Sequence, residues 1–158
     1  LLSIVNSEVQ SIQASGLSIL TDSIDIAHAR IQFKNGTVSS LVSSRIAQVE
    51  LRKIKVFEKD FYATVDLLLG LTEVYKVINK ITDTPNAIQT KYFDYKNKKT
   101  LIAYEKPDII TDDALKMELF NFIETVKGKA KPIVSGKEAK KALALALDIQ
   151  NLIIKDIQ

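Results

Sequence analysis

The sequence predicts an α+β domain: a large, mostly antiparallel, twisted sheet with two helices packed on one face. Two observations support this fold class. Strand-like stretches dominate the chain up to about residue 105, and helical periodicity starts only near residue 112. Strands that come first and helices that come last favour α+β over alternating βαβ units. No repeat or linker interrupts the 158 residues, so we expect one domain over 1–158.

The clearest local signal is a β-hairpin centred on Asn35-Gly36. Residues 26–33 and 37–46 on either side of it both have strand-like composition. An Asn-Gly pair between two such segments is typical of a type I′ turn, in which both central residues need a positive φ. This turn would place the two segments side by side as neighbouring antiparallel strands.

Further strand-like segments precede and follow this hairpin. They alternate polar and apolar residues or are rich in β-branched and aromatic residues, which is the pattern of half-buried strands. A turn near Gly70 would join two of them, and Lys96 to Lys99 would join the last pair. The segments are 9–15, 53–58, 61–67, 72–78, 90–95 and 100–105.

The first helix is predicted from Asp112-Asp113 to a stop at Gly128. Apolar residues recur at helical spacing within it, and the two carboxylates suit the positive end of the helix dipole. A second helix opens with Ser135 and Glu138, the spacing of a capping box. The apolar positions are Leu115, Leu119, Phe122 and Val126 in the first helix, and Ala142, Leu145, Ala146, Ile149, Leu152 and Ile153 in the second.

Composition excludes several classes of site. The sequence has no cysteine, so disulfides, thiolate nucleophiles and zinc–thiolate sites are excluded. A formal net charge of +3 is too small to indicate nucleic acid or an anionic membrane as partner. No apolar stretch approaches the roughly 18–20 residues of a membrane span. We expect a cytoplasmic protein without metal.

The chain starts at Leu1, and its single methionine is Met117. Residues 1–8 resemble the last turns of a helix that ends in a polar segment. We therefore expect the sequence to start inside a longer protein.

Two residues are candidates for lining a substrate site, His28 and Arg45. His28 is the single histidine, and strand alternation places it on one face with Ile26 and Arg30. It is either an ordinary strand residue or a polar group in a cleft. Arg45 follows several serines and would bind a phosphate or carboxylate, or form a salt bridge at the sheet edge.

Residues for a self-contained active site are missing from the sequence. Neither a GxGxxG loop nor a P-loop is present, so no cofactor-binding residue is assigned. Glu105-Lys106-Pro107 is better explained as a strand exit than as a catalytic lysine, because proline ends strand pairing. The carboxylates, Asp25 among them, are scattered without a spacing that indicates acid–base catalysis.

Several motifs together resemble the C-terminal domain of the glucose–fructose oxidoreductase/inositol dehydrogenase (Gfo/Idh/MocA) family. The resemblance covers nearly the whole chain and is strongest to members that act on UDP-N-acetyl amino sugars. Its motifs are Asp25-Ile26-Ala27-His28-Ala29-Arg30-Ile31-Gln32-Phe33-Lys34-Asn35-Gly36, Ser43-Ser44-Arg45-Ile46, Arg52 to Phe57 with Asp60, Tyr62 and Asp66, Glu118-Leu119 with Phe122, and Pro132 to Glu138 with Ala142 to Leu147.

The resemblance implies an NAD(P)-dependent oxidoreductase that transfers a hydride to or from a sugar or nucleotide sugar. It implies that a separate N-terminal Rossmann domain binds NAD or NADP and that the catalytic residues lie upstream of residue 1. This chain alone would then be inactive. His28 stands where the family more often has Asn.

The resemblance also implies a homo-oligomer formed through the open face of the sheet. The alternative to the oxidoreductase function is a stand-alone, sheet-mediated dimerisation or interaction domain without catalysis. A strand–GxGxxG–helix encoded upstream would favour the oxidoreductase.

Overall fold

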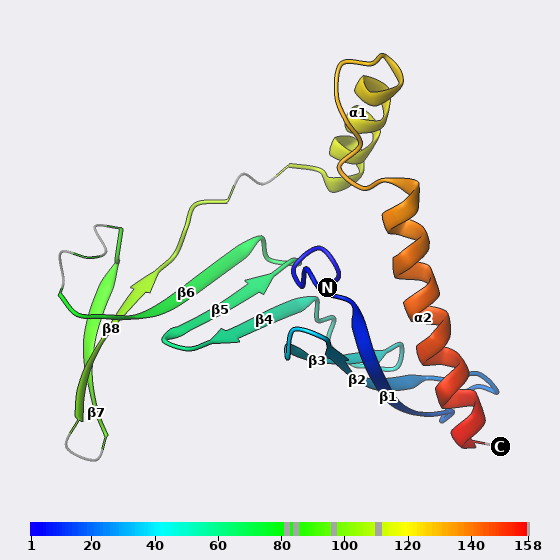
Figure 1. Ribbon diagram of the computed structural model, residues 1–158, viewed down its shortest axis with the longest axis horizontal. Helices are drawn as coiled ribbons and strands as arrows, with labels where there is room; N and C mark the ends of the chain where they lie inside the picture. Colours follow the sequence, from blue (N-terminus) through cyan, green and yellow to red (C-terminus); the bar gives the residue numbers. More distant parts are fainter. Residues whose placement is uncertain (81–82, 84–85, 96–97, 110–111, 158) are drawn as a thin grey trace. The chain divides into compact units, whose positions relative to one another are not determined.

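The computed structural model describes residues 1–80, 83, 86–95, 98–109 and 112–157 (Figure 1). Within these residues, eight strands precede two helices, as the sequence predicts. The strands are β1 (Val9–Leu17), β2 (Ile26–Phe33), β3 (Val38–Ser44), β4 (Lys53–Glu58), β5 (Phe61–Asp66), β6 (Leu71–Ile78), β7 (Gln89–Tyr95) and β8 (Lys98–Glu105); the helices are α1 (Ala114–Val126) and α2 (Gly136–Ile157).

The chain divides into two compact units, residues 1–48 with 119–158 and residues 49–118. The α+β class and the antiparallel pairing are confirmed, but the strands form two sheets where the sequence predicted one large sheet. The first sheet has the order β1-β2-β3, and the second has the order β4-β5-β6-β8-β7. The division falls at residues 45–52, which form no strand and so carry no ladder from β3 to β4.

The β2–β3 hairpin is confirmed, but its predicted turn type is wrong. Gly36 has a φ of 86°, whereas Asn35 has no positive φ. The Gly36 N–H donates to the Phe33 carbonyl at 3.0 Å, and the Phe33 N–H donates to the Thr37 carbonyl at 2.9 Å. The loop therefore has three residues, 34–36, one more than a type I′ turn. In such a three-residue hairpin loop only the glycine takes the left-handed conformation. Asn35 instead accepts a bond from the Thr37 N–H at 3.1 Å.

Helix α2 covers one face of the first sheet through its C-terminal half. Ile153 is 1% exposed and packs at Gly16 of β1, where a Cβ would lie 2.7 Å from the Ile153 Cγ2. Ala29, Ile31 and Phe33 of β2 are the buried strand residues of this unit. The glycine thus allows the close approach of the helix to the sheet.

Helix α2 begins at the predicted capping box. The Ser135 N–H donates to Glu138 Oε2 at 2.7 Å, and the Glu138 N–H donates to the Ser135 hydroxyl at 3.3 Å. Fewer apolar residues of α2 are shielded from solvent than the sequence predicts. Leu145, Ile149 and Ile153 are shielded, while the other predicted apolar positions, Ala142, Ala146 and Leu152, stay exposed.

The second sheet carries a ladder of four aromatic residues on one face. Phe57, Tyr62, Tyr75 and Tyr104 lie directly opposite one another on β4, β5, β6 and β8. Their successive ring centroids are 4.8, 5.6 and 5.1 Å apart. Cross-strand aromatic pairs of this kind fix the register of a sheet. The opposite face carries the buried residues Ala63, Val74, Leu101 and Ala103.

The predicted turns of the second unit are confirmed where the structure describes them. Gly70 has a φ of 58° in the turn between β5 and β6. Strands β7 and β8 pair as a hairpin, although its turn residues 96–97 lie outside the described residues. Pro85 of the predicted loop 79–87 also lies outside the described residues.

Helix α1 begins and ends as predicted. The Asp113 carboxylate accepts from the N–H groups of Leu115 and Lys116 at 2.9 and 3.1 Å, which makes it the N-cap. Gly128, with a φ of 71°, follows the last turn. Unlike α2, α1 buries none of its residues.

Residues 1–8 form a turn where the sequence predicts the tail of a helix. The N–H groups of Ile4 and Val5 both donate to the Leu1 carbonyl, at 2.9 and 3.0 Å. One such i→i+4 bond is a single α-type turn, shorter than a regular helix. That a longer helix precedes this turn stays a prediction.

Candidate functional site

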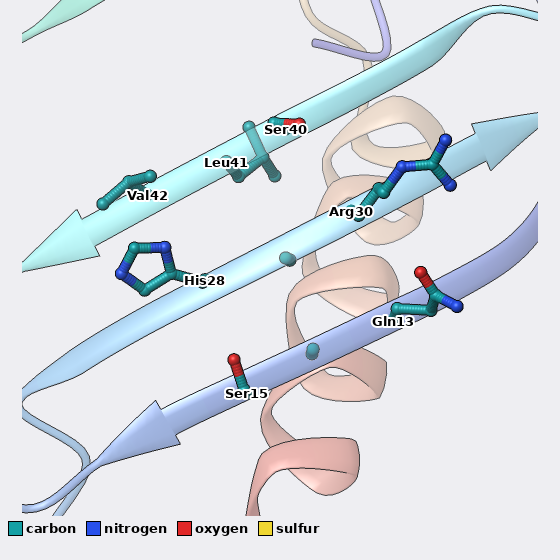
Figure 2. A pocket seen from close by; sticks show the side chains of 9 residues that line it. Gln13, Ser15, His28, Arg30, Ser40, Leu41 and Val42 are labelled. Atoms are coloured by element: carbon teal, nitrogen blue, oxygen red, sulfur yellow. The ribbon is translucent and has the colours of Figure 1, made fainter.

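The face of the first sheet opposite α2 carries a depression of about 350 Å³, which polar and apolar residues line together (Figure 2). Two rows of cross-strand neighbours line it. One row is Ser15, His28 and Val42, and the other is Gln13, Arg30 and Ser40. Each row crosses β1, β2 and β3, so the three strands together position the side chains.

Strand alternation explains why His28 and Arg30 share this face. Both are exposed, and they alternate with Ala29 and Ile31, which are buried. The predicted placement of His28 and Arg30 on one face is therefore confirmed, and Figure 2 shows both side chains on the side away from the helix.

The chemistry of this depression suits a ligand with phosphate, carboxylate or hydroxyl groups. None of the nine residues that line it is acidic. The Arg30 guanidinium offers donors in a planar fork, and Gln13 and the two serines add donors and acceptors. Such a set can bind an anion or a polyhydroxylated ring.

Arg45 lies elsewhere, at the end of β3, and clamps the loop that leads into β2. Its Nε donates to Asp25 Oδ1 at 2.8 Å, and its Nη2 donates to the Ile24 carbonyl at 2.8 Å. The same nitrogen contacts the hydroxyls of Thr21 and Ser23. The structure contains one of the two roles left open for Arg45, the salt bridge, and the binding of a phosphate or carboxylate stays a prediction.

Asp25 is the centre of this clamp and is 2% exposed. Its Oδ2 accepts from the N–H groups of Ile19, Leu20 and Thr21 at 2.7, 2.7 and 3.1 Å. The N–H groups of Leu20 and Ile19, ahead of other causes, hold the pKa of this carboxyl far below its usual range. Asp25 is therefore ionised at neutral pH.

The structure does not bring His28 and Arg45 together. Arg45 lines a second depression, of about 390 Å³, which Ser43 of β3 and Gln150 of α2 also line. That depression lies on the α2 side of the sheet, whereas His28 faces the other side. The two candidate residues cannot line one small pocket within this unit.

Sequence reasoning missed the role of Asp25, which it grouped with scattered carboxylates. The available signal was local, because Thr21-Asp22-Ser23 precedes Asp25 in a short polar loop. In such loops an Asp side chain often accepts hydrogen bonds from nearby backbone N–H groups. Its partner Arg45 lies 20 residues away, and the distance between the two in space is not readable from the sequence.

Glu105-Lys106-Pro107 is a strand exit, as predicted. Glu105 is the last residue of β8 and forms an ion pair with Lys76 of β6 at 2.8 Å. Lys106 follows outside the strand. Nearby, the Tyr104 hydroxyl donates to Glu73 Oε1 at 3.0 Å, and this bond raises the pKa of Tyr104.

Two features are absent from the described residues. Within the ranges that the structure describes, no three His, Asp or Glu side chains gather where a metal ion would fit. Neither described helix has the length and apolar character needed to cross a membrane.

Comparisons with known proteins confirm the predicted resemblance. No family model matches the sequence. Over 150 residues, the chain is 25% identical to UDP-N-acetylglucosamine 3-dehydrogenase from Acidithiobacillus ferrooxidans, a match that covers 94% of this chain and 43% of that protein, in its C-terminal portion. This match is consistent with the predicted resemblance to the C-terminal domain of the Gfo/Idh/MocA family.

Solved structures show the same fold. The crystal structure of that enzyme, GnnA, aligns with a TM-score of 0.78 at 24% identity, over 99% of this chain and 44% of GnnA. An NAD-binding protein from Listeria innocua aligns with a TM-score of 0.70 at 16% identity, over 98% of this chain and 46% of that one. The chain thus spans less than half the length of the relatives it matches.

Proposed function

We propose that this chain, a homologue of the C-terminal portion of a sugar-nucleotide dehydrogenase, is the C-terminal portion of an NAD(P)-dependent oxidoreductase. The observation that carries the proposal is the agreement of fold and sequence over nearly the whole chain with UDP-N-acetylglucosamine 3-dehydrogenase. In this proposal the protein works in the cytoplasm and oxidises a hydroxyl, or reduces a carbonyl, of a sugar nucleotide by hydride transfer.

The cofactor and the catalytic residues belong, in this proposal, to the part of the protein that precedes residue 1. The chain contains no glycine-rich phosphate loop of the GxGxxG type. NAD or NADP would supply the hydride acceptor or donor, and this chain would shape the substrate site. The 158 residues alone would then catalyse no reaction.

For the substrate we propose the depression around His28 and Arg30. Its donors and its lack of acidic lining residues suit the phosphates and hydroxyls of a sugar nucleotide. Arg45 would act on the substrate site indirectly. By binding Asp25, it would fix the loop that leads into the strand carrying His28.

The proposed homo-oligomer forms through the aromatic face of the second sheet. Phe57 is 74% exposed there, at one end of the ladder of Tyr62, Tyr75 and Tyr104. Exposed aromatic residues are enriched at the centres of protein interfaces. The same observation supports the alternative function, a dimerisation domain without catalysis.

The test uses the full-length protein, expressed from its complete coding sequence. We expect UDP-N-acetylglucosamine to reduce NAD⁺ or NADP⁺ in its presence, measured by nicotinamide absorbance. His28→Ala should raise KM by about tenfold, the equivalent of one hydrogen bond of about 1.4 kcal/mol. Gln10→Ala, an exposed β1 residue outside the depression, is the control.

Two results would argue against this function. A full-length protein that forms a dimer but binds no nicotinamide cofactor would favour the alternative. Equal KM values for His28→Ala and Gln10→Ala would remove the depression from the proposed substrate site, while leaving the reaction class intact.

A further inference from the structure

Arg30 carries a positive charge that no neighbouring carboxylate balances. Among the residues that the structure describes, Arg30 belongs to no ion pair. The other arginine of its unit, Arg45, is already paired with Asp25 at 2.8 Å. The Arg30 side chain is exposed and lines the depression, where no lining residue is acidic. An unbalanced guanidinium in such a place favours an anionic ligand.

The two residues beside Arg30 strengthen this preference. Gln13 of β1 and Ser40 of β3 lie directly opposite it on the neighbouring strands. The Gln13 amide and the Ser40 hydroxyl can both donate hydrogen bonds, as the guanidinium does. Phosphate oxygens accept bonds from all three kinds of donor. The row of Gln13, Arg30 and Ser40 therefore suits a phosphate group.

The row through His28 has a different chemistry. Its neighbours are Ser15 of β1 and Val42 of β3, and Val42 is 68% exposed. The imidazole and the Ser15 hydroxyl can exchange hydrogen bonds with hydroxyl groups, while the Val42 side chain offers an apolar contact. A sugar ring has hydroxyl groups at its edge and C–H groups on its faces. The row of Ser15, His28 and Val42 therefore suits a sugar ring.

The spacing of the two rows matches a sugar that carries a phosphate. Their positions on β2 are two residues apart, which is about 7 Å along a strand. Figure 2 shows the His28 and Arg30 side chains directed toward opposite ends of the depression. A phosphate joined to a sugar ring and a hydroxyl across that ring are separated by a similar length. Both rows belong to the unit of residues 1–48 and 119–158, so this geometry depends on one unit alone.

We infer that Arg30 binds the diphosphate of the sugar nucleotide and that His28 binds its sugar ring. The inference rests on the proposed function and deepens it, because it makes Arg30 the residue that selects nucleotide-linked sugars. A free sugar has no phosphate and would contact the His28 row alone. A nicotinamide dinucleotide also carries a diphosphate, so the test must separate these two sources.

The test is isothermal titration calorimetry of the full-length protein with UDP, UDP-N-acetylglucosamine and NAD⁺. The variants are Arg30→Gln, Arg30→Lys and His28→Ala, each checked for folding by circular dichroism. Lys34→Gln is the matched control. It removes the same charge within the same unit, at a residue that is 64% exposed and does not line the depression.

We expect Arg30→Gln to weaken UDP binding at least about tenfold, because the charged hydrogen bonds to phosphate are lost. Arg30→Lys should fall between this variant and the wild type, since lysine keeps the charge but not the planar fork. His28→Ala should leave the Kd of UDP unchanged and weaken binding of UDP-N-acetylglucosamine alone. Lys34→Gln should change neither Kd.

Three results would overturn the inference. The first is an equal Kd for UDP in Arg30→Gln and Lys34→Gln. The second is weaker binding of NAD⁺ rather than UDP in Arg30→Gln, which would assign the depression to the cofactor. The third is a loss of UDP binding in His28→Ala as large as in Arg30→Gln, which would refute the order of the two rows.

The failure of this inference is distinguishable from that of the proposed function. A full-length protein that oxidises UDP-N-acetylglucosamine, yet binds UDP equally well without Arg30, refutes the inference alone. A full-length protein that binds neither UDP nor a nicotinamide cofactor refutes both.

Discussion

Arg45 holds Asp25 by both its side chain and its main chain. Arg45 Nε donates to Asp25 Oδ1 at 2.8 Å, and the Arg45 N–H donates to the Asp25 carbonyl at 3.1 Å. The end of β3 is thereby tied to the residue that precedes β2. Because Asp25 also accepts three N–H groups from the loop, one carboxylate joins the β1–β2 loop to the end of β3.

The first prediction is that Asp25→Asn destabilises the protein. The amide can accept fewer of these bonds, carries no charge to pair with Arg45, and brings an NH₂ group toward backbone donors. Unfolding in urea, followed by circular dichroism, should show a clearly lower midpoint. Asp22→Asn, in the same loop but exposed, is the matched control and should leave the midpoint unchanged. Equal effects of the two substitutions would refute the role of Asp25.

The second prediction concerns acid. The pKa of Asp25 in the folded protein is far below the value of about 3.9 expected for an unfolded chain. The folded state therefore binds fewer protons, and the stabilisation is present above about pH 4 and is lost as pH falls toward the folded pKa. Urea midpoints at pH 7 and pH 3 should differ less for Asp25→Asn than for Asp22→Asn. An identical pH dependence in both variants would contradict this.

The third prediction is that Gly16→Ala disturbs the packing of α2. A Cβ at Gly16 would lie 2.7 Å from Ile153 Cγ2 and 2.8 Å from the Ile26 carbonyl oxygen. Overpacking of this kind costs about 1–3 kcal/mol. Gly136→Ala is the matched control, since no atom lies within 4 Å of its Cβ position, and it should be neutral or stabilising by up to about 1 kcal/mol. The free energy of unfolding in urea measures both.

The local elements could be predicted from the sequence because their signals are local. The Asn35-Gly36 hairpin, the Ser135–Glu138 capping box and the Gly128 stop each depend on residues a few positions apart. The division into two sheets could not be predicted. It depends on where strand pairing ends between β3 and β4, and adjacent strand-like segments fit one sheet or two equally well.

The candidate site was predictable only in part, for the same reason. Alternation placed His28 and Arg30 on one face, because a strand has a period of two. The use of Arg45 depended on Asp25, 20 residues earlier, and on the fold of the loop between them. Equally, the apolar pattern of α1 predicted a helix that packs on the sheet, whereas its polar Asn121 makes the contact with the following segment.

The fourth prediction concerns the proposed dimer. Phe57 contributes an exposed ring to the aromatic ladder, stacked 4.8 Å from Tyr62. Phe57→Ser should weaken dimerisation at least tenfold, because exposed aromatic side chains at an interface contribute most of its affinity. Stability of the subunit should fall by no more than about 1.5 kcal/mol, the worth of one aromatic pair. Sedimentation equilibrium of the full-length protein measures the dissociation constant.

Tyr92→Ser is the control for this variant, since Tyr92 is 64% exposed on β7 of the same sheet. Its register opposite Leu101, a buried residue, places it on the other face from the ladder. If both variants weaken the dimer equally, the interface is not the aromatic face. A full-length protein that stays monomeric at micromolar concentration would refute the dimer itself. The exposed ring of Phe57 would then have no second copy to cover it.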